Sequence, residues 1–265
     1  MLRIFINTDL EGISGIGRSE YIKSALNRPD LIAEARKLLA EDINACVAGC
    51  FDAGADVVTV RDGHGGGGNL KRRDIDDRAN FIDGPMLEER FHALDDYDAF
   101  MQIGSHAMAG TVNAILEHSF SSSSYQNCWL NGKPIGEIGV LAYAAGEHGL
   151  PCILVSGDDK ACAEAREQIP EVVTAEVKKA YSCFGGFFPP LSVTHKLIHD
   201  KAMEAIEAFR AGKIPIYKPS YPCTFRAELI ERLQVPHNKA PYKVIDAHTF
   251  EVEMPSVEKV FLQMW

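Results

Sequence analysis

The sequence predicts an α/β fold, with three layers (α/β/α) around a mostly parallel central sheet and a small α+β subdomain at the C-terminus. Short β-rich apolar segments alternate with amphipathic helical segments along most of the 265-residue chain. Strands separated by helices are typical of a parallel sheet that carries helices on both faces. Beyond about Pro189 this alternation ends, and a helix is followed by a predicted hairpin.

The first half of the chain contains three predicted strands and one long helix. Leu2–Asn7 is a short β-rich apolar stretch that runs into a polar loop, which predicts a strand and its exit. Between Leu31 and Phe51, apolar residues recur at three- and four-residue steps, the spacing of an amphipathic helix. Val57–Val60 is β-branched throughout and predicts the second strand. Ala99–Ile103 predicts the third, and both of these strands end in glycine-containing loops.

A hairpin and a further strand–helix unit follow. Asn131 and Gly132 stand between apolar residues, which is the strongest short-range signal for a β-hairpin. Cys152–Val155 predicts another strand, and the polar residues after it lead into a helix over Ala161–Gln168.

The C-terminal part predicts a helix over Thr194–Phe209 and a hairpin formed by Tyr242–Ile245 and Thr249–Val252. No linker rich in Gly, Ser or Pro divides the chain. We therefore expect a single domain over residues 1–265, with a core of about 1–188 and a C-terminal subdomain of about 189–265.

Composition and charge exclude several classes of protein. The chain has 37 acidic and 27 basic residues, a formal net charge of -10 that would repel a phosphate backbone, so we expect no nucleic-acid partner. The apolar runs are far shorter than the roughly 20 residues of a membrane span, and the first residues lack the pattern of a signal peptide. We expect a cytoplasmic protein with no membrane partner. The seven cysteines form no metal or redox spacing and are expected to be buried, reduced thiols.

Metal-ligand residue types collect where the predicted strands end. Asp9 and Glu11, His64, and His106 follow three different strands closely, at the same edge of the predicted sheet. In open α/β sheets this edge is where ligands bind. Because Asp9 and Glu11 are two residues apart, an extended backbone would point both carboxylates to one side, where they could hold a cation.

Two further residues extend this cluster. Glu137 is flanked by glycines, which let the backbone approach a crowded site, and His118 follows in the loop after His106. Leaving His118 aside, the three carboxylates and two imidazoles carry a charge of about -3, which suits two divalent cations. A single cation would leave the site overcharged. These five residues are Asp9, Glu11, His64, His106 and Glu137.

Each of these residues also has a simpler interpretation. Asp9 and Glu11 could cap a following helix, and His64, in a glycine-rich loop, could be solvated. His106 and His118 could be polar residues whose hydrogen bonds are satisfied. The coincidence at several strand ends favours a metal site over these alternatives.

Short motifs are spread from Met1 to about Lys179, namely Asp9–Gly15, Asp62–His64, Gly104–Ala107, His118–Ser119, Gly136–Gly139, Gly157–Asp159 and Val177–Lys179. In their order and spacing the chain resembles the DppA-type D-aminopeptidases, a family of bacterial zinc metallopeptidases. The opening D-x-E-G-I-S-G motif is specific to that family. After Lys179 only the length of the chain agrees with it.

The resemblance implies a three-layer α/β/α fold and a site for two zinc ions. Asp9 then corresponds to the bridging carboxylate, Glu11 and His64 to ligands of one zinc, and His106 and Glu137 to ligands of the other. His118 corresponds to the catalytic histidine of the family. The resemblance also implies a large ring-like homo-oligomer, such as a decamer, with the sites facing an inner cavity.

The implied activity is removal of the N-terminal residue from short peptides, with D-amino-acid peptides such as D-Ala dipeptides as substrates. Two zinc ions can polarise the peptide carbonyl, acidify a water and anchor the substrate amine. Arg61 and Met108 depart from residues common in the family, which leaves the substrate preference open. The alternatives are an aminopeptidase for L- or β-amino acids, a two-metal phosphoesterase, and a non-catalytic oligomeric metal-binding protein.

Overall fold

The centre of the molecule is a seven-stranded sheet. The computed structural model describes residues 1–23, 27–84, 92–232, 235–236 and 240–264. The strands of the central sheet are β1 (Arg3–Thr8), β2 (Val57–Asp62), β3 (Asn80–Ile82), β4 (Ala99–Ser105), β7 (Cys152–Asp158), β8 (Val173–Ser182) and β9 (Gly185–Phe187). They lie in the order β3-β2-β1-β4-β7-β8-β9. All neighbours are parallel except β9, which pairs antiparallel with β8.

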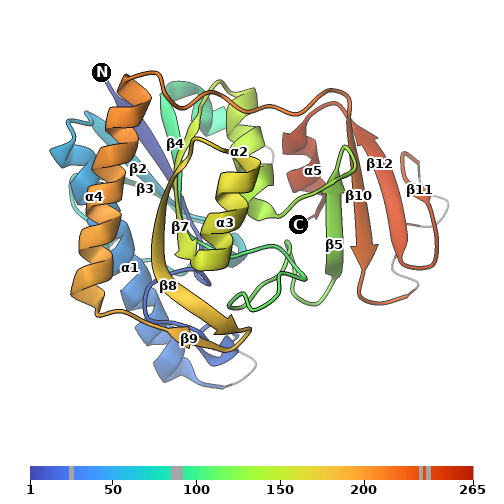
Figure 1. Cartoon of the computed structure of the whole chain (residues 1–265), viewed down its shortest axis with the longest axis horizontal. Helices are drawn as coiled ribbons and strands as arrows, with labels where there is room; N and C mark the ends of the chain where they lie inside the picture. The colour runs from blue at the N-terminus through green and yellow to red at the C-terminus, as the bar shows by residue number, and fades with distance from the viewer. Residues whose placement is uncertain (24–26, 85–91, 233–234, 237–239, 265) are drawn as a thin grey trace.

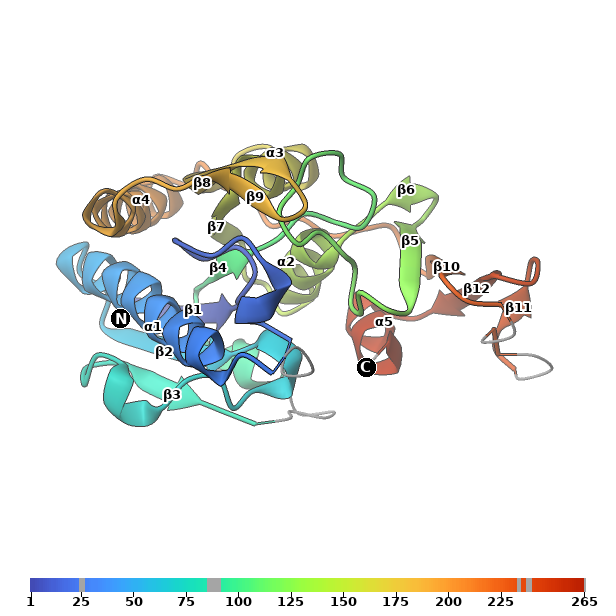
Figure 2. The same cartoon turned by 90° about the horizontal axis from the view of Figure 1, so that it is seen from below.

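Helices cover both faces of this sheet, which gives the three layers. On one face α1 (Pro29–Asp52) packs beside α4 (Leu191–Arg210). On the other face lie α2 (Glu137–Glu147) and α3 (Asp159–Gln168) (Figures 1 and 2). The predicted α/β/α fold with a mostly parallel sheet is therefore confirmed.

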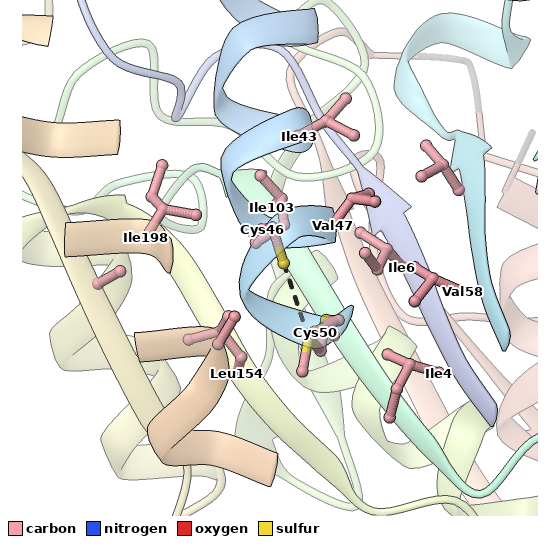
Figure 3. Packing of buried hydrophobic residues seen from close by; sticks show 14 of the residues in the cluster. Ile4, Ile6, Ile43, Cys46, Val47, Cys50, Val58, Ile103, Leu154 and Ile198 are labelled. Carbon is pink, nitrogen blue, oxygen red and sulfur yellow. Dashed lines mark hydrogen bonds between the residues drawn. The ribbon is translucent and has the colours of Figure 1, made fainter. Parts of the chain in front are cut away.

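Alternation along β1 divides the apolar core between the two faces. Ile4 and Ile6 pack with α1, where Cys46 and Val47 are fully buried (Figure 3). Phe5 points the opposite way, into the core under α2. Each of these large side chains contributes about 1.5–3 kcal/mol when it is fully buried. The cysteines are free thiols, and all are buried as expected except Cys183, which is exposed because it lies in the turn after β8.

A second, antiparallel sheet lies beyond α2. Its strands are β5 (Tyr125–Leu130), β6 (Lys133–Pro134), β10 (Cys223–Leu229), β11 (Lys243–Val244) and β12 (Thr249–Met254), in the order β11-β12-β10-β5-β6. The terminal helix α5 (Val257–Met264) packs against α2. Asn131 and Gly132 have φ angles of 50° and 78° between β5 and β6, which are the left-handed conformations of the predicted hairpin turn.

The second sheet does not coincide with the expected subdomain of about residues 189–265. Helix α4 follows residue 189 yet belongs to the α1 layer, and β5 and β6 precede it yet belong to the second sheet. The chain therefore crosses between the two sheets more than once, and the single-domain organisation stays a prediction. Within the described part of the chain, no helix is long and apolar enough to cross a membrane.

Candidate metal centre

The loop after β1 lies directly against the end of β4. The Asp9 amide donates to the carbonyl of Ile103 at 2.8 Å, and the Gly12 amide donates to the carbonyl of Gly104 at 2.7 Å. A Cβ on Gly12 would stand 1.9 Å from the carbonyl oxygen of Ser105, so only glycine fits there. This close approach brings the side chains of the first loop beside the residue that follows β4, which is His106.

His64 is held at the start of the glycine-rich loop after β2. The buried carboxylate of Asp62 accepts hydrogen bonds from the amides of Asn69 (2.6 Å) and Leu70 (2.9 Å), which folds the loop back on the strand. His64 Nδ1 then lies 3.0 Å from Asp9 Oδ1 and 3.0 Å from Glu11 Oε2. The first predicted trio is therefore assembled.

His106 faces the other oxygen of the same aspartate. Its Nε2 lies 3.4 Å from Asp9 Oδ2 and 3.3 Å from Glu137 Oε1. Its Nδ1 is 3.0 Å from the carbonyl oxygen of Ala107. Nδ1 must donate in that contact, which in the neutral ring leaves the lone pair of Nε2 for a cation. Asp9 thus stands between two imidazoles, with one carboxylate oxygen toward each.

Glu137 enters the site as the first residue of α2. Its Oε1 accepts a hydrogen bond from the amide of Phe120 at 2.7 Å. The expected close approach of the neighbouring backbone is present, because a Cβ on Gly136 would lie 2.6 Å from Glu164 Oε1 and 2.7 Å from the Cβ of Met108. The sequence assigned Glu137 to no helix or strand, and the structure places it at the N-terminus of α2.

His118 stacks on His106, with ring centroids 3.9 Å apart and an interplanar angle of 14°. Its Nδ1 donates to the carbonyl of Leu116 at 2.9 Å, which fixes the ring and directs Nε2 away from the loop. Leu116 and Phe120 have φ angles of 53° and 59°, a conformation that costs energy for side chains other than glycine. The strained backbone on both sides of His118 is thus part of the site.

The charges of the cluster shift the pKa values of its members. Burial alone would lower the pKa of His64 and His106, but Glu11 and Asp9 around the first and Glu137 and Asp9 around the second raise both well above 6.5. Burial would raise the pKa of Asp9 and Glu137, but the facing imidazoles lower both. The carboxylates therefore favour positive charge between them, which is the electrostatic requirement for binding cations.

The residues fit a zinc site. Asp9, Glu11 and His106 offer ligand atoms within 4.8 Å of one another, and so do His106, His118 and Glu137. Glu11 Oε2 is buried 3.0 Å from His64 Nδ1, but it accepts no hydrogen bond of good geometry from the described residues, and a bound cation would balance its charge. Carboxylate oxygens and imidazole nitrogens are ligands that zinc takes. The second group also places His118 within ligand range, where sequence reasoning assigned it to catalysis alone.

Lys178, on β8, belongs to the Val177–Lys179 motif, but the sequence assigned it no role in the site. Its buried ammonium donates to the backbone carbonyls of Glu11 (2.6 Å), Ile13 (2.8 Å) and Ile16 (2.9 Å). Burial lowers its pKa to about 8, against the opposing effect of nearby carboxylates. The ammonium ties the loop that carries two predicted ligands to a strand two positions away from β4 in the sheet. The Val177–Lys179 motif was the available signal, because simple alternation fails there: Val177 and Lys178 are both buried, beside a shift in the register of β7 and β8.

All six predicted site residues line one cavity of about 550 Å³ at the carboxyl ends of β1, β2 and β4. Its opposite wall comes from α2 and from the loop before β5. An open α/β sheet with carboxylates and imidazoles converging on such a cavity is the arrangement of an α/β protein with a metal centre at the edge of its sheet.

The family model for D-aminopeptidases matches residues 2–265, so the chain belongs to the D-aminopeptidase family. It is 32% identical over 183 residues to a D-aminopeptidase of Bacillus subtilis, an alignment that covers 68% of this chain and 65% of that protein. It is also similar to the solved structure of the Zn-dependent D-aminopeptidase DppA from Bacillus subtilis, described as a self-compartmentalizing protease. The TM-score is 0.90 at 25% identity, with 99% of this chain and 95% of that chain covered. The predicted family is confirmed.

Proposed function

We propose that this protein is a zinc-dependent D-aminopeptidase that removes the N-terminal residue from short peptides, including D-Ala dipeptides. The observation that carries the proposal is the position of Asp9, which presents one carboxylate oxygen to His64 and the other to His106. Membership of the family and the likeness to a zinc-dependent relative support the metal and the reaction.

The chain's own residues divide into ligands and a proton-handling group. Asp9, Glu11 and His64 would hold one zinc, and Asp9, His106 and Glu137 a second. Bound zinc would supply an acidified water, a polarised carbonyl and an anchor for the free amine. His118 is fixed through Nδ1, so its Nε2 is the atom that would pass a proton to the leaving amine or stabilise the developing oxyanion.

The charge of the cluster supports a site for two zinc ions per subunit. Five ligand side chains, three of them carboxylates, exceed what one tetrahedral zinc uses. Elemental analysis of protein purified without chelator should find more than one zinc per chain. A fully active protein with one zinc or less would exclude the two-metal site. Glu11→Ala and His64→Ala should each lose metal and activity together, and Asp9→Ala should lose more of both.

His118→Ala separates catalysis from ligation. If His118 handles protons, the variant should keep its zinc and lose about 10²- to 10³-fold in kcat, with a much smaller change in KM. His148→Ala, at a histidine outside the cavity, is the matched control. Zinc lost together with activity would make His118 a ligand, and full kcat with full zinc would remove it from the mechanism.

The substrate class is tested with chromogenic anilides. D-alanine p-nitroanilide should be hydrolysed in the presence of zinc, L-alanine p-nitroanilide much more slowly, and a phosphomonoester not at all. Faster hydrolysis of the L-anilide would reverse the proposed stereochemistry. Zinc-dependent hydrolysis of the phosphomonoester alone would favour a phosphoesterase.

We also propose self-association into a large ring-like homo-oligomer, such as a decamer. Large apolar side chains are exposed around the β8–β9 hairpin, among them Tyr181 (65%), Phe184 (61%) and Phe187 (54%), and exposed patches of this kind are typical of interaction sites. Light scattering should give a mass several times 29.1 kDa, which Phe184→Asp should reduce. An active monomer would contradict the proposal. The cytoplasm stays the predicted compartment, and cell fractionation would test it.

A further inference from the structure

A row of three buried polar side chains crosses the floor of the cavity, one layer below the predicted ligands. Arg61, Asn7 and Gln102 lie on β2, β1 and β4 and are paired in register, so they share one face of the sheet. All three are buried, at 3%, 6% and 1% exposure. All three also line the cavity that holds the metal centre. We call these residues the floor row.

The row carries a positive charge at a defined place. The guanidinium of Arg61 donates from Nη1 to Asn7 Oδ1 at 2.6 Å, which holds the side chain along the sheet. Arginine remains protonated even when buried, and its planar fork binds a carboxylate through two parallel hydrogen bonds. A buried cation that lines a substrate cavity is therefore suited to an anionic group on the substrate.

Gln102 provides a second, independent observation. Its Nε2 donates to the carbonyl of Ile138 at 3.0 Å, which fixes the orientation of the amide. Its Oε1, at the other end of the amide, has no hydrogen-bond partner among the described residues. A buried acceptor without a donor costs free energy, so Oε1 is placed to accept a hydrogen bond from an N–H group of a bound molecule.

The distance between the floor row and the ligands matches a short peptide. Asn7 precedes Asp9 by two residues, which is about 6–7 Å along the strand, and two residues of extended peptide span about the same length. From these observations we infer that the floor row is a subsite for a substrate carboxylate, with Arg61 binding the carboxylate and Gln102 accepting from a neighbouring N–H. This inference rests on the proposed aminopeptidase function. The carboxylate is either the C-terminus of a dipeptide or an acidic side chain of the N-terminal residue.

The test compares substrates that differ only in the carboxylate. D-alanyl-D-alanine is measured against D-alanyl-D-alaninamide, and D-glutamate p-nitroanilide against the D-glutamine compound, using the zinc-loaded protein. In one of the two pairs the acid should have a kcat/KM about 10- to 100-fold higher than its amide, mostly through KM. The pair that shows the preference identifies which carboxylate the row binds.

Three variants connect that preference to the row. Arg61→Met should bring the ratio of acid to amide close to one, and Gln102→Glu, which places a negative charge in the same row, should reduce it even if Arg61→Met fails to fold. Lys23→Met is the matched control, because Lys23 lines the same cavity but is exposed. Its ratio should equal that of the wild type.

The outcomes separate this inference from the proposed function. Hydrolysis of acid and amide at equal kcat/KM in both pairs overturns the subsite and leaves the aminopeptidase intact. A ratio that falls in Lys23→Met and not in Arg61→Met overturns it as well. If neither dipeptide nor anilide is hydrolysed, the proposed function fails. In that case calorimetry gives the Kd values of the dipeptide and its amide for wild type and Arg61→Met. Tighter binding of the acid that is lost in Arg61→Met would support the subsite, and equal Kd values in the wild type would overturn it.

Discussion

Replacing Glu164 with glutamine should change how the stability of this protein depends on pH. Glu164 lies on α3, behind the loop that follows His106, and its Oε2 accepts a hydrogen bond from the amide of Met108 at 2.7 Å. Its Oε1 is buried without a hydrogen-bond partner among the described residues. Burial raises the pKa of Glu164 from 4.5 to about 7, against the opposing effects of the Met108 amide and His106.

The sign follows from proton binding. Between about pH 4.5 and pH 7 the unfolded chain has released the Glu164 proton and the native protein has kept it, so the free energy of unfolding falls as pH rises. A shift of one pKa unit is worth about 1.36 kcal/mol. The Glu164 carboxyl therefore costs the native protein about 2.5 kcal/mol more at pH 8 than at pH 5, and glutamine removes that difference.

The assay is denaturant unfolding of wild type and Glu164→Gln across that pH range, with chelator present and protein concentration fixed. Groups common to both proteins cancel in the difference between them. The variant should gain stability relative to wild type as pH rises, by about 2.5 kcal/mol over the range. Glu167→Gln, at an exposed carboxylate on the same helix, should show no such trend. A constant difference between wild type and Glu164→Gln would refute the buried, protonated carboxyl.

Three further predictions concern the site. Lys178→Met should lower the free energy of unfolding by about 3 kcal/mol or more and weaken zinc binding, because three backbone carbonyls lose their donor. Thermal unfolding with and without zinc checks this, and Lys179→Met, at an exposed lysine, is the control. Gly12→Ala should destabilise by more than about 3 kcal/mol, because its Cβ would meet backbone, and an unchanged Tm would contradict the packing. Zinc added to metal-free protein should release protons, fewer at higher pH, because the pKa values of His64 and His106 are raised. Calorimetry in two buffers of different ionisation enthalpy counts the protons released.

The central strands and amphipathic helices could be predicted because each carries a strong local pattern. Strands β1, β2 and β4 and helices α1 and α4 all lie where periodicity places them. Helix α2 has no such pattern, because it is buried between the main sheet and α5 and is apolar on nearly every side. Strand β10 was not predicted. It is stabilised by pairing with β5 and β12, and such contacts between separate segments leave little local pattern in the sequence.

The candidate site could be predicted as a set of residues but not as a geometry. The shared edge of a parallel sheet is enough to bring Asp9, His64 and His106 together. The stacking of His118 on His106 depends on a strained loop, and the tether from Lys178 depends on strand order. Neither leaves a periodic signal in the sequence, so both required the structure.

The tether from Lys178 to the loop that follows β1 has a consequence for biosynthesis. A nascent chain that has emerged as far as Glu137 already contains every predicted ligand, yet it lacks the ammonium that bonds to the carbonyls of residues 11, 13 and 16. The loop with the first two ligands can take its final shape only after β8 has been translated and has docked beside β7. We therefore expect the metal to bind only after most of the chain has left the ribosome. Truncated translation products that end before β8 should bind zinc more weakly than the full chain.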